Sequence, residues 1–104
     1  MLYAGFRVTP APGQGPILLP QVARLNKLVQ KHGAKPIANF VVGVGQNQGD
    51  QIHIFAYKDW AAFGAAGEAL QADAEWLQFL ADVATKVSSI SSSVLQPTPE
   101  SGLQ

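Results

Sequence analysis

The segment from Pro36 to Gly45 constrains the fold most strongly, because its alternating side chains are apolar on both faces. One face carries Ala38, Phe40, Val42 and Val44, and the other carries Ile37, Asn39 and Val41. Such a strand is expected in a sheet that is covered on both sides. The chain must therefore supply helices for one face of its sheet and something else for the second face.

The composition indicates that a second copy of the chain covers the other face of the sheet. Charged residues make up 13% of the 104 residues and hydrophobic residues 47%, so the charged share is about half of that in an ordinary globular protein. A chain this poor in charge is expected to bury part of its outer surface in an interface. The net charge is zero, so we expect no nucleic-acid partner.

The remaining helices and strands are predicted from the periodicity of the apolar residues and from the residues that end helices and strands. Residues 2–9 alternate as a strand, and residues 17–32 carry apolar side chains at helical spacing until Gly33. A turn at residues 46–50 leads into a strand at residues 52–57. Asp59 and Asp73 are expected to cap two further helices. A last strand is expected at residues 88–95, followed by an extended tail at residues 96–104.

This order, β-α-β-β-α-(α)-β, predicts an α+β domain that spans residues 1–104. Short connections and right-handed crossovers favour a ferredoxin-like split β-α-β fold, with a four-stranded antiparallel sheet and its helices on one face. We expect the other face to carry Tyr3, Ile37, Val41, Phe55 and Tyr57, which is too apolar for open solvent. Two such faces would pack as a homodimeric α/β barrel. The alternative is that a helix or the tail of the same chain covers this face.

Several classes of site are not expected. The chain has no cysteine, which excludes disulfides and thiolate chemistry and is compatible with the cytoplasm. The N-terminus lacks the pattern of a signal peptide, and no apolar run is long enough for a membrane span. His32 and His53 are far apart in the sequence and have no carboxylate cluster beside them, so we expect no metal. Gly43-Val44-Gly45 does not lead into a helix, and we expect no cofactor.

Several motifs resemble the NIPSNAP family. Its first strand is matched by Tyr3, Arg7 and the Pro12-Gly13 turn, and its helix end by His32-Gly33. The strand His53-Ile54-Phe55-Ala56-Tyr57 also fits the family pattern. Towards the C-terminus the resemblance lies in Leu70, Asp73, Glu75-Trp76 and the segment from Leu95 to Ser101. It covers nearly the whole chain and implies a dimeric α/β barrel.

The chain departs from the family pattern at polar positions. The family usually has a glutamate before the arginine of its first strand, and residues 2–10 contain no acidic residue. Matching Arg7 to the family arginine also requires a one-residue deletion before Pro12. Arginines of the family's second long helix are replaced here by residues such as Phe63 and Gly67. If those polar groups serve the family's function, this chain has lost or changed it.

A few polar side chains are candidates for a small-molecule site in an otherwise apolar cavity. We expect the odd-numbered positions of the first and third strands to share one face of the sheet and to bring Arg7 close to His53. His53 could act as a general base, and the planar guanidinium of Arg7 could hold an anionic group. The alternative for His53 is a histidine hydrogen-bonded in the dimer interface, and the alternative for Arg7 is an interface salt bridge. The predicted ligand-binding residues are Tyr3, Arg7, Asn39, His53, Tyr57 and Ser91.

Two functions remain open on the sequence. The first is a dimer that binds a small, largely apolar molecule in a cavity between the sheet and its dimer partner. By analogy with relatives of this barrel, it could be a monooxygenase-like or isomerase-like enzyme that needs no cofactor. The second is a non-catalytic scaffold, in which the Pro-rich tail or the Ala/Gly-rich helix meets a protein partner. The aligned polar residues favour the first function, and the lost polar residues favour the second.

Overall fold

The computed structural model describes residues 1–104 and contains one antiparallel sheet in the order β2-β3-β1-β4. Its strands are β1 (Leu2–Pro10), β2 (Lys35–Val41), β3 (Gln51–Tyr57) and β4 (Val87–Leu95). The central strands are thus the first and third in the chain, as in the split β-α-β arrangement. The predicted α+β, ferredoxin-like fold and its element order are confirmed.

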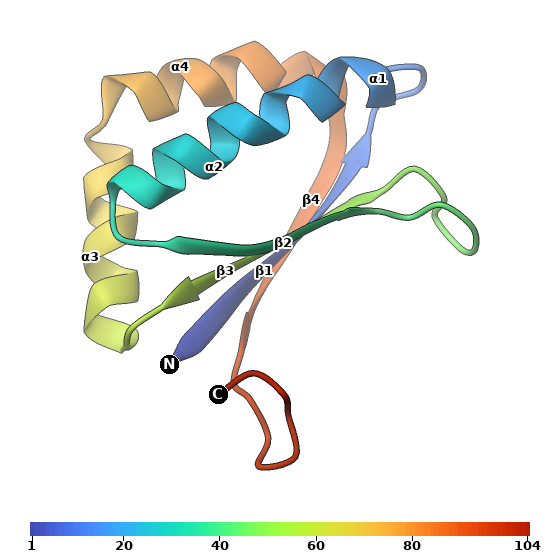
Figure 1. Cartoon of the computed structure of the whole chain (residues 1–104). Helices are drawn as coiled ribbons and strands as arrows, with labels where there is room; N and C mark the ends of the chain where they lie inside the picture. Colours follow the sequence, from blue (N-terminus) through green and yellow to red (C-terminus); the bar gives the residue numbers. More distant parts are fainter.

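All helices lie on one face of this sheet (Figure 1). They are α1 (Gly15–Leu18), α2 (Val22–Lys31), α3 (Trp60–Gln71) and α4 (Ala74–Val83), with short 3₁₀ turns at Leu19–Gln21 and Ala84–Lys86. The helix predicted over residues 17–32 is interrupted at the first of these turns, which contains Pro20. A proline is tolerated there because the first turn of a helix does not need its N–H group.

Helix α2 ends where the sequence predicts. Gly33 adopts a φ of 94°, a backbone conformation that glycine reaches without steric cost. The N–H of Gly33 donates to the carbonyl of Gln30, and the N–H of Ala34 donates to the carbonyl of Val29. This pair of bonds is a Schellman motif, and it turns the chain directly into β2.

The predicted caps of the other two helices are also present. The Asp59 carboxylate accepts from the N–H of Ala62 at the start of α3, and the Asp73 carboxylate accepts from the N–H of Glu75 at the start of α4. Asp73 also binds the Lys31 ammonium at 2.9 Å and His32 Nε2 at 2.7 Å. These contacts tie the end of α2 to the junction between α3 and α4.

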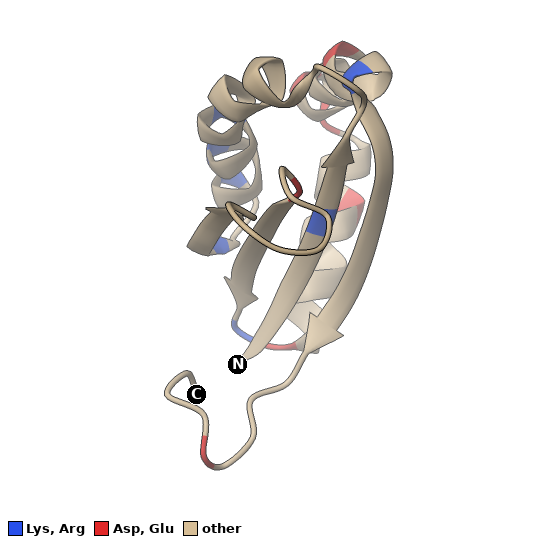
Figure 2. Cartoon of the chain, turned by 90° about the vertical axis from the view of Figure 1, so that its right-hand side faces the viewer, with Lys and Arg blue, Asp and Glu red and all other residues tan.

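The second face of the sheet has no helix over it, and Figure 2 looks onto that face. The loop after β2 bends in front of it, held by a 2.8 Å ion pair between Arg7 on β1 and the buried Asp50. Strand β2 ends at Val41, earlier than predicted. The N–H of Val42 donates to the carbonyl of Asp50, and the N–H of Gly49 donates to the carbonyl of Val42, inside the loop.

The tail at residues 96–104 contains no helix or strand. Instead of running out extended, it curls back on itself, because the side chain of Gln104 donates to the carbonyls of Thr98 and Ser101. Both views place it beyond the end of β4 and not across the sheet (Figures 1 and 2). The alternative that a helix or the tail covers the open face is not what the structure shows.

None of the helices combines the length and the apolar character needed to cross a lipid bilayer.

Candidate functional site

The register between β1 and β3 decides which polar residues can meet. Phe6 pairs with His53 and Arg7 pairs with Ile52, so even-numbered residues of β1 share a face with odd-numbered residues of β3. Side chains of directly paired residues project to the same side of a sheet. The prediction that Arg7 and His53 share a face is therefore wrong. His53 faces the helices, and Arg7 faces the open side.

The same register corrects the predicted composition of the open face. Phe55 and Tyr57 are buried in the core beneath the helices, with Phe55 fully inaccessible. Val41 pairs with Gln51 and also lies on the helix-covered side. Tyr3 is on the open side as expected, since it pairs with Ala56. The open face is made of other residues, among them Ile52 and Ile54 of β3.

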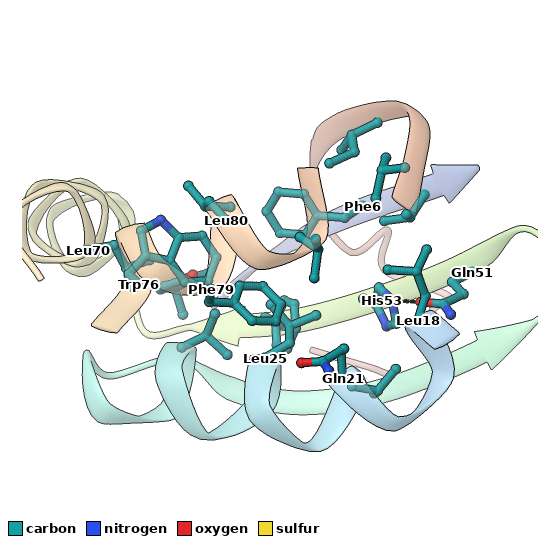
Figure 3. Close-up of a pocket in the computed structure, with 18 residues that line it drawn as sticks. Phe6, Leu18, Gln21, Leu25, Gln51, His53, Leu70, Trp76, Phe79 and Leu80 are labelled. Atoms are coloured by element: carbon teal, nitrogen blue, oxygen red, sulfur yellow. Dashed lines mark hydrogen bonds between the residues drawn. The ribbon is translucent and has the colours of Figure 1, made fainter. Parts of the chain in front are cut away.

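A cavity of about 200 Å³ lies between the sheet and the helices (Figure 3). The sequence placed the cavity on the opposite side of the sheet, against a dimer partner. Of its 18 lining residues 15 are hydrophobic, and none carries a charge at neutral pH. Leu80 and Ile90 are lining residues that are 40% and 57% exposed, so the cavity opens between α4 and β4. The residues that line it are Phe6, Val8, Leu18, Gln21, Val22, Leu25, Val29, Gln51, His53, Phe55, Tyr57, Leu70, Trp76, Phe79, Leu80, Val83, Val87 and Ile90.

Aromatic side chains form much of the wall. Trp76 and Phe79 on α4 stack with ring centroids 5.6 Å apart. Across from them on the sheet, Phe6 and Phe55 lie 6.0 Å apart in a tilted arrangement. Arg24 lies over the ring of Phe79 and pairs with Asp82 at 2.7 Å, which ties α2 to α4 outside the cavity.

The polar part of the cavity is a chain of hydrogen bonds that begins at the protein surface. The side-chain N–H of Asn26 on α2 donates to Asn39 Oδ1 at 2.8 Å. Asn39 Nδ2 lies 2.8 Å from His53 Nδ1, and His53 Nε2 lies 3.0 Å from Gln51 Oε1. Figure 3 shows the contact between His53 and Gln51. An amide nitrogen can only donate and an amide oxygen can only accept. The proton of His53 therefore sits on Nε2.

Burial keeps two of these groups uncharged. It lowers the pKa of His53 below its usual value and raises the pKa of the Tyr57 hydroxyl, since the charged form of each would lose solvation. The cavity is therefore lined by a neutral imidazole and a neutral phenol. Both nitrogens of His53 are engaged in hydrogen bonds, so the ring has no free lone pair for a substrate proton.

Three of the predicted site residues lie on the other side of the sheet. Arg7 and Ser91 pair across β1 and β4 and line a shallow depression on the open face, and Tyr3 lies on that face as well. Only Asn39, His53 and Tyr57 lie on the helix-covered side. Asn39 does not line the cavity itself and stands behind His53.

Sequence reasoning missed the carboxamides of Gln51 and Gln21. Gln51 precedes His53 by two residues on the same strand, so period-two alternation alone places both on one face. That signal was available in the sequence. Gln21 is different, because it precedes α2 in a 3₁₀ turn whose orientation depends on how α1 packs.

No group of three or more histidine, aspartate or glutamate side chains is close enough to hold a metal ion.

Taken together, the split β-α-β sheet, the single helical layer and the apolar cavity between them define a ferredoxin-like α+β protein with an internal pocket. The NIPSNAP family model matches residues 11–102. The chain therefore belongs to the NIPSNAP family.

Solved structures agree with this assignment. An uncharacterized NIPSNAP domain protein from Burkholderia xenovorans superposes with a TM-score of 0.86 at 20% identity, over 97% of this chain and 98% of that one. A NIPSNAP family protein from Agrobacterium tumefaciens gives 0.86 at 19% identity, over 99% and 98%. An antibiotic biosynthesis monooxygenase gives 0.66 at 17% identity, over 95% and 100%. At these identities the likeness concerns the fold. No curated protein matches the chain.

Proposed function

We propose that this protein binds a small, neutral and largely apolar molecule in the cavity between its sheet and its helices. The observation that carries the proposal is the lining, which combines aromatic and aliphatic walls with a few polar groups and no charge. An apolar cavity of about 150 Å³ is enough to hold benzene. A cavity of about 200 Å³ therefore suits a molecule of one or two fused rings.

We propose further that the protein acts as a homodimer through the open face of its sheet. The whole molecule measures 38 × 36 × 18 Å, as expected of two layers without a third. Phe40 is 56% exposed and Leu95 is 42% exposed on the open face, and Ile52 and Ile54 lie between them. An apolar face of this kind supports an interface between two copies.

Binding is better supported than catalysis. A cofactor-independent enzyme of the monooxygenase kind would need a group in the cavity that can take or hold a substrate proton. His53 is the obvious candidate, but both of its nitrogens are occupied by Asn39 and Gln51. The fold shared with an antibiotic biosynthesis monooxygenase leaves catalysis as the second candidate.

The binding proposal can be tested with tetralin (1,2,3,4-tetrahydronaphthalene), a neutral two-ring hydrocarbon, followed by amide chemical shifts in two-dimensional NMR. We expect saturable shifts at residues that line the cavity. Val22→Phe should weaken binding at least tenfold, because a larger side chain at this partly exposed lining position occupies ligand space. Ala23→Phe is the matched control, since the exposed Ala23 does not line the cavity. Absence of saturable shifts, or equal binding by both variants, would contradict the proposal.

A further inference from the structure

The hydrogen-bond chain that runs from Asn26 to Gln51 has a direction, and it ends in the cavity. Each link donates to the next in one sense, from Asn26 to Asn39, from Asn39 to His53 and from His53 to Gln51. Only Asn39 Nδ2 also donates weakly back to Asn26, at 3.3 Å. Successive hydrogen bonds polarise one another in a low-dielectric interior. The chain therefore strengthens the donor at its end.

That last donor is the side-chain nitrogen of Gln51. The oxygen of the same carboxamide accepts from His53 at 3.0 Å, and the nitrogen has no partner within the protein. Gln51 is only 5% exposed and lines the cavity. No fully enclosed side-chain nitrogen or oxygen lacks a partner in this structure, so the Gln51 nitrogen keeps some contact with solvent.

The hydroxyl of Tyr57 is a second side-chain group without a partner. Its side chain also lines the cavity and is 5% exposed, and its hydroxyl makes no hydrogen bond within the protein. Gln51 and Tyr57 stand at the two ends of β3, six residues apart, a span of about 20 Å along the strand. Buried groups of this kind normally have a partner, because leaving one unpaired costs its full desolvation free energy.

We infer that the cavity selects a neutral molecule carrying a hydrogen-bond acceptor oxygen, such as a ketone carbonyl, which accepts from the side-chain N–H of Gln51. This rests on the binding function proposed above and adds the ligand class. His53 and Asn39 are then positioning residues. They hold the Gln51 carboxamide with its oxygen away from the ligand and its nitrogen free.

The proposed ligand class is favoured over two alternatives on physical grounds. A carboxylate ligand would enter a cavity that offers no cation, and burying an unpaired charge is far more costly than burying a carbonyl. A pure hydrocarbon would leave the Gln51 donor unpaired. A ketone pairs with that donor and fills the apolar walls with its rings.

The test compares 1-tetralone with tetralin, two molecules of similar shape that differ in one carbonyl, by titration calorimetry. We expect the preference for 1-tetralone over tetralin to fall roughly fivefold in Gln51→Met, which keeps the length of the side chain and removes its donor. Gln30→Met is the matched control, because Gln30 is exposed on α2 and does not line the cavity. Its preference should equal that of the unchanged protein.

A second measurement does not depend on any variant folding. In ¹⁵N NMR of the unchanged protein, His53 should carry its proton on Nε2, and the side-chain amide of Gln51 should shift with 1-tetralone but not with tetralin. A variant then tests the positioning role separately: in Asn39→Leu the tautomer of His53 should become mixed and the preference for 1-tetralone should weaken.

The outcomes separate the two proposals. If both probes bind and Gln51→Met keeps the preference, or if His53 is protonated on Nδ1, the acceptor inference is overturned while the binding function stands. If neither probe binds, both proposals fail. Loss of the preference in Gln51→Met but not in Gln30→Met supports the inference.

Discussion

At the scale of single residues, the environment of His53 determines its protonation. It is 2% exposed, its neighbours in the hydrogen-bond chain are the neutral side chains of Asn39 and Gln51, and no charged group contacts its ring. Burial therefore lowers its pKa without any compensating carboxylate. A neutral imidazole with hydrogen bonds at both ring nitrogens fits the positioning role that we propose for His53.

The lowered pKa of His53 makes the free energy of unfolding depend on pH in a defined direction. The unfolded chain takes up a proton at His53 near the ordinary pKa of 6.5, and the folded chain does so only at lower pH. The unfolded state therefore binds more protons in that window, and the free energy of unfolding falls as the pH drops below about 6.5. Urea unfolding of the unchanged protein between pH 8 and pH 5 should show this loss.

Substitutions at the two histidines show which group is responsible, with His32 as the control for His53. His53→Gln should remove the part of the pH dependence that begins near 6.5, whereas His32→Gln should retain it, because His32 pairs with Asp73 outside the cavity. An unchanged pH profile in His53→Gln would show that another group is responsible.

The residue scale also shows where sequence reasoning stops. Alternation correctly grouped His53 with Tyr57, and Arg7 with Tyr3. It could not say which pair faces the helices, because that depends on the register between β1 and β3, which are more than 40 residues apart. A shift of one residue exchanges the two faces of a strand. Three of the six predicted site residues were placed on the wrong side for this reason.

At the scale of helices and strands, local sequence signals were sufficient to predict where the helices begin and end. Gly33, Asp59 and Asp73 act through backbone groups within a few residues of themselves, so their effect can be predicted without knowing the rest of the fold. The β2 boundary was less accurate, since Val42 bonds with Gly49 and Asp50 in the loop and leaves the strand early. The loop is also anchored by the long-range ion pair between Arg7 and Asp50, which the local sequence pattern does not reveal.

Backbone conformation at two glycines predicts opposite effects of the same substitution. Gly33→Ala should lower the free energy of unfolding by about 1 kcal/mol, because an L side chain is strained at a φ of 94°. Gly67→Ala should raise it by about 0.5–1 kcal/mol, since Gly67 lies inside α3. A Cβ at either position meets nothing within 4 Å. Clashes with neighbouring atoms therefore do not determine whether the free energy of unfolding rises or falls. Urea unfolding measures both, and two changes of equal sign would contradict this explanation.

At the scale of the whole molecule, one sheet separates two surfaces of different composition. The helix-covered face encloses the cavity, and the open face carries Arg7, Ser91 and exposed apolar side chains. The sequence correctly predicted that the sheet has two apolar faces, and it assigned the cavity to the wrong one. We therefore expect the proposed ligand binding and the proposed dimerisation to be separable, because the two surfaces lie on opposite faces of the sheet.

Ile54 provides the test of the second surface. It lies on β3, one of the two central strands, on the open face and lines the shallow depression there. Ile54→Arg should convert a dimer to a monomer, since a buried guanidinium without a partner is strongly unfavourable in an apolar interface. Leu77→Arg is the matched control, because Leu77 is 51% exposed on α4 and lies outside the cavity lining. Light scattering after size-exclusion chromatography should find a dimer for the unchanged protein and for Leu77→Arg. The Ile54→Arg monomer should still bind tetralin, because the cavity lies on the opposite face. A monomeric unchanged protein, or a dimeric Ile54→Arg, would remove the open face as the interface.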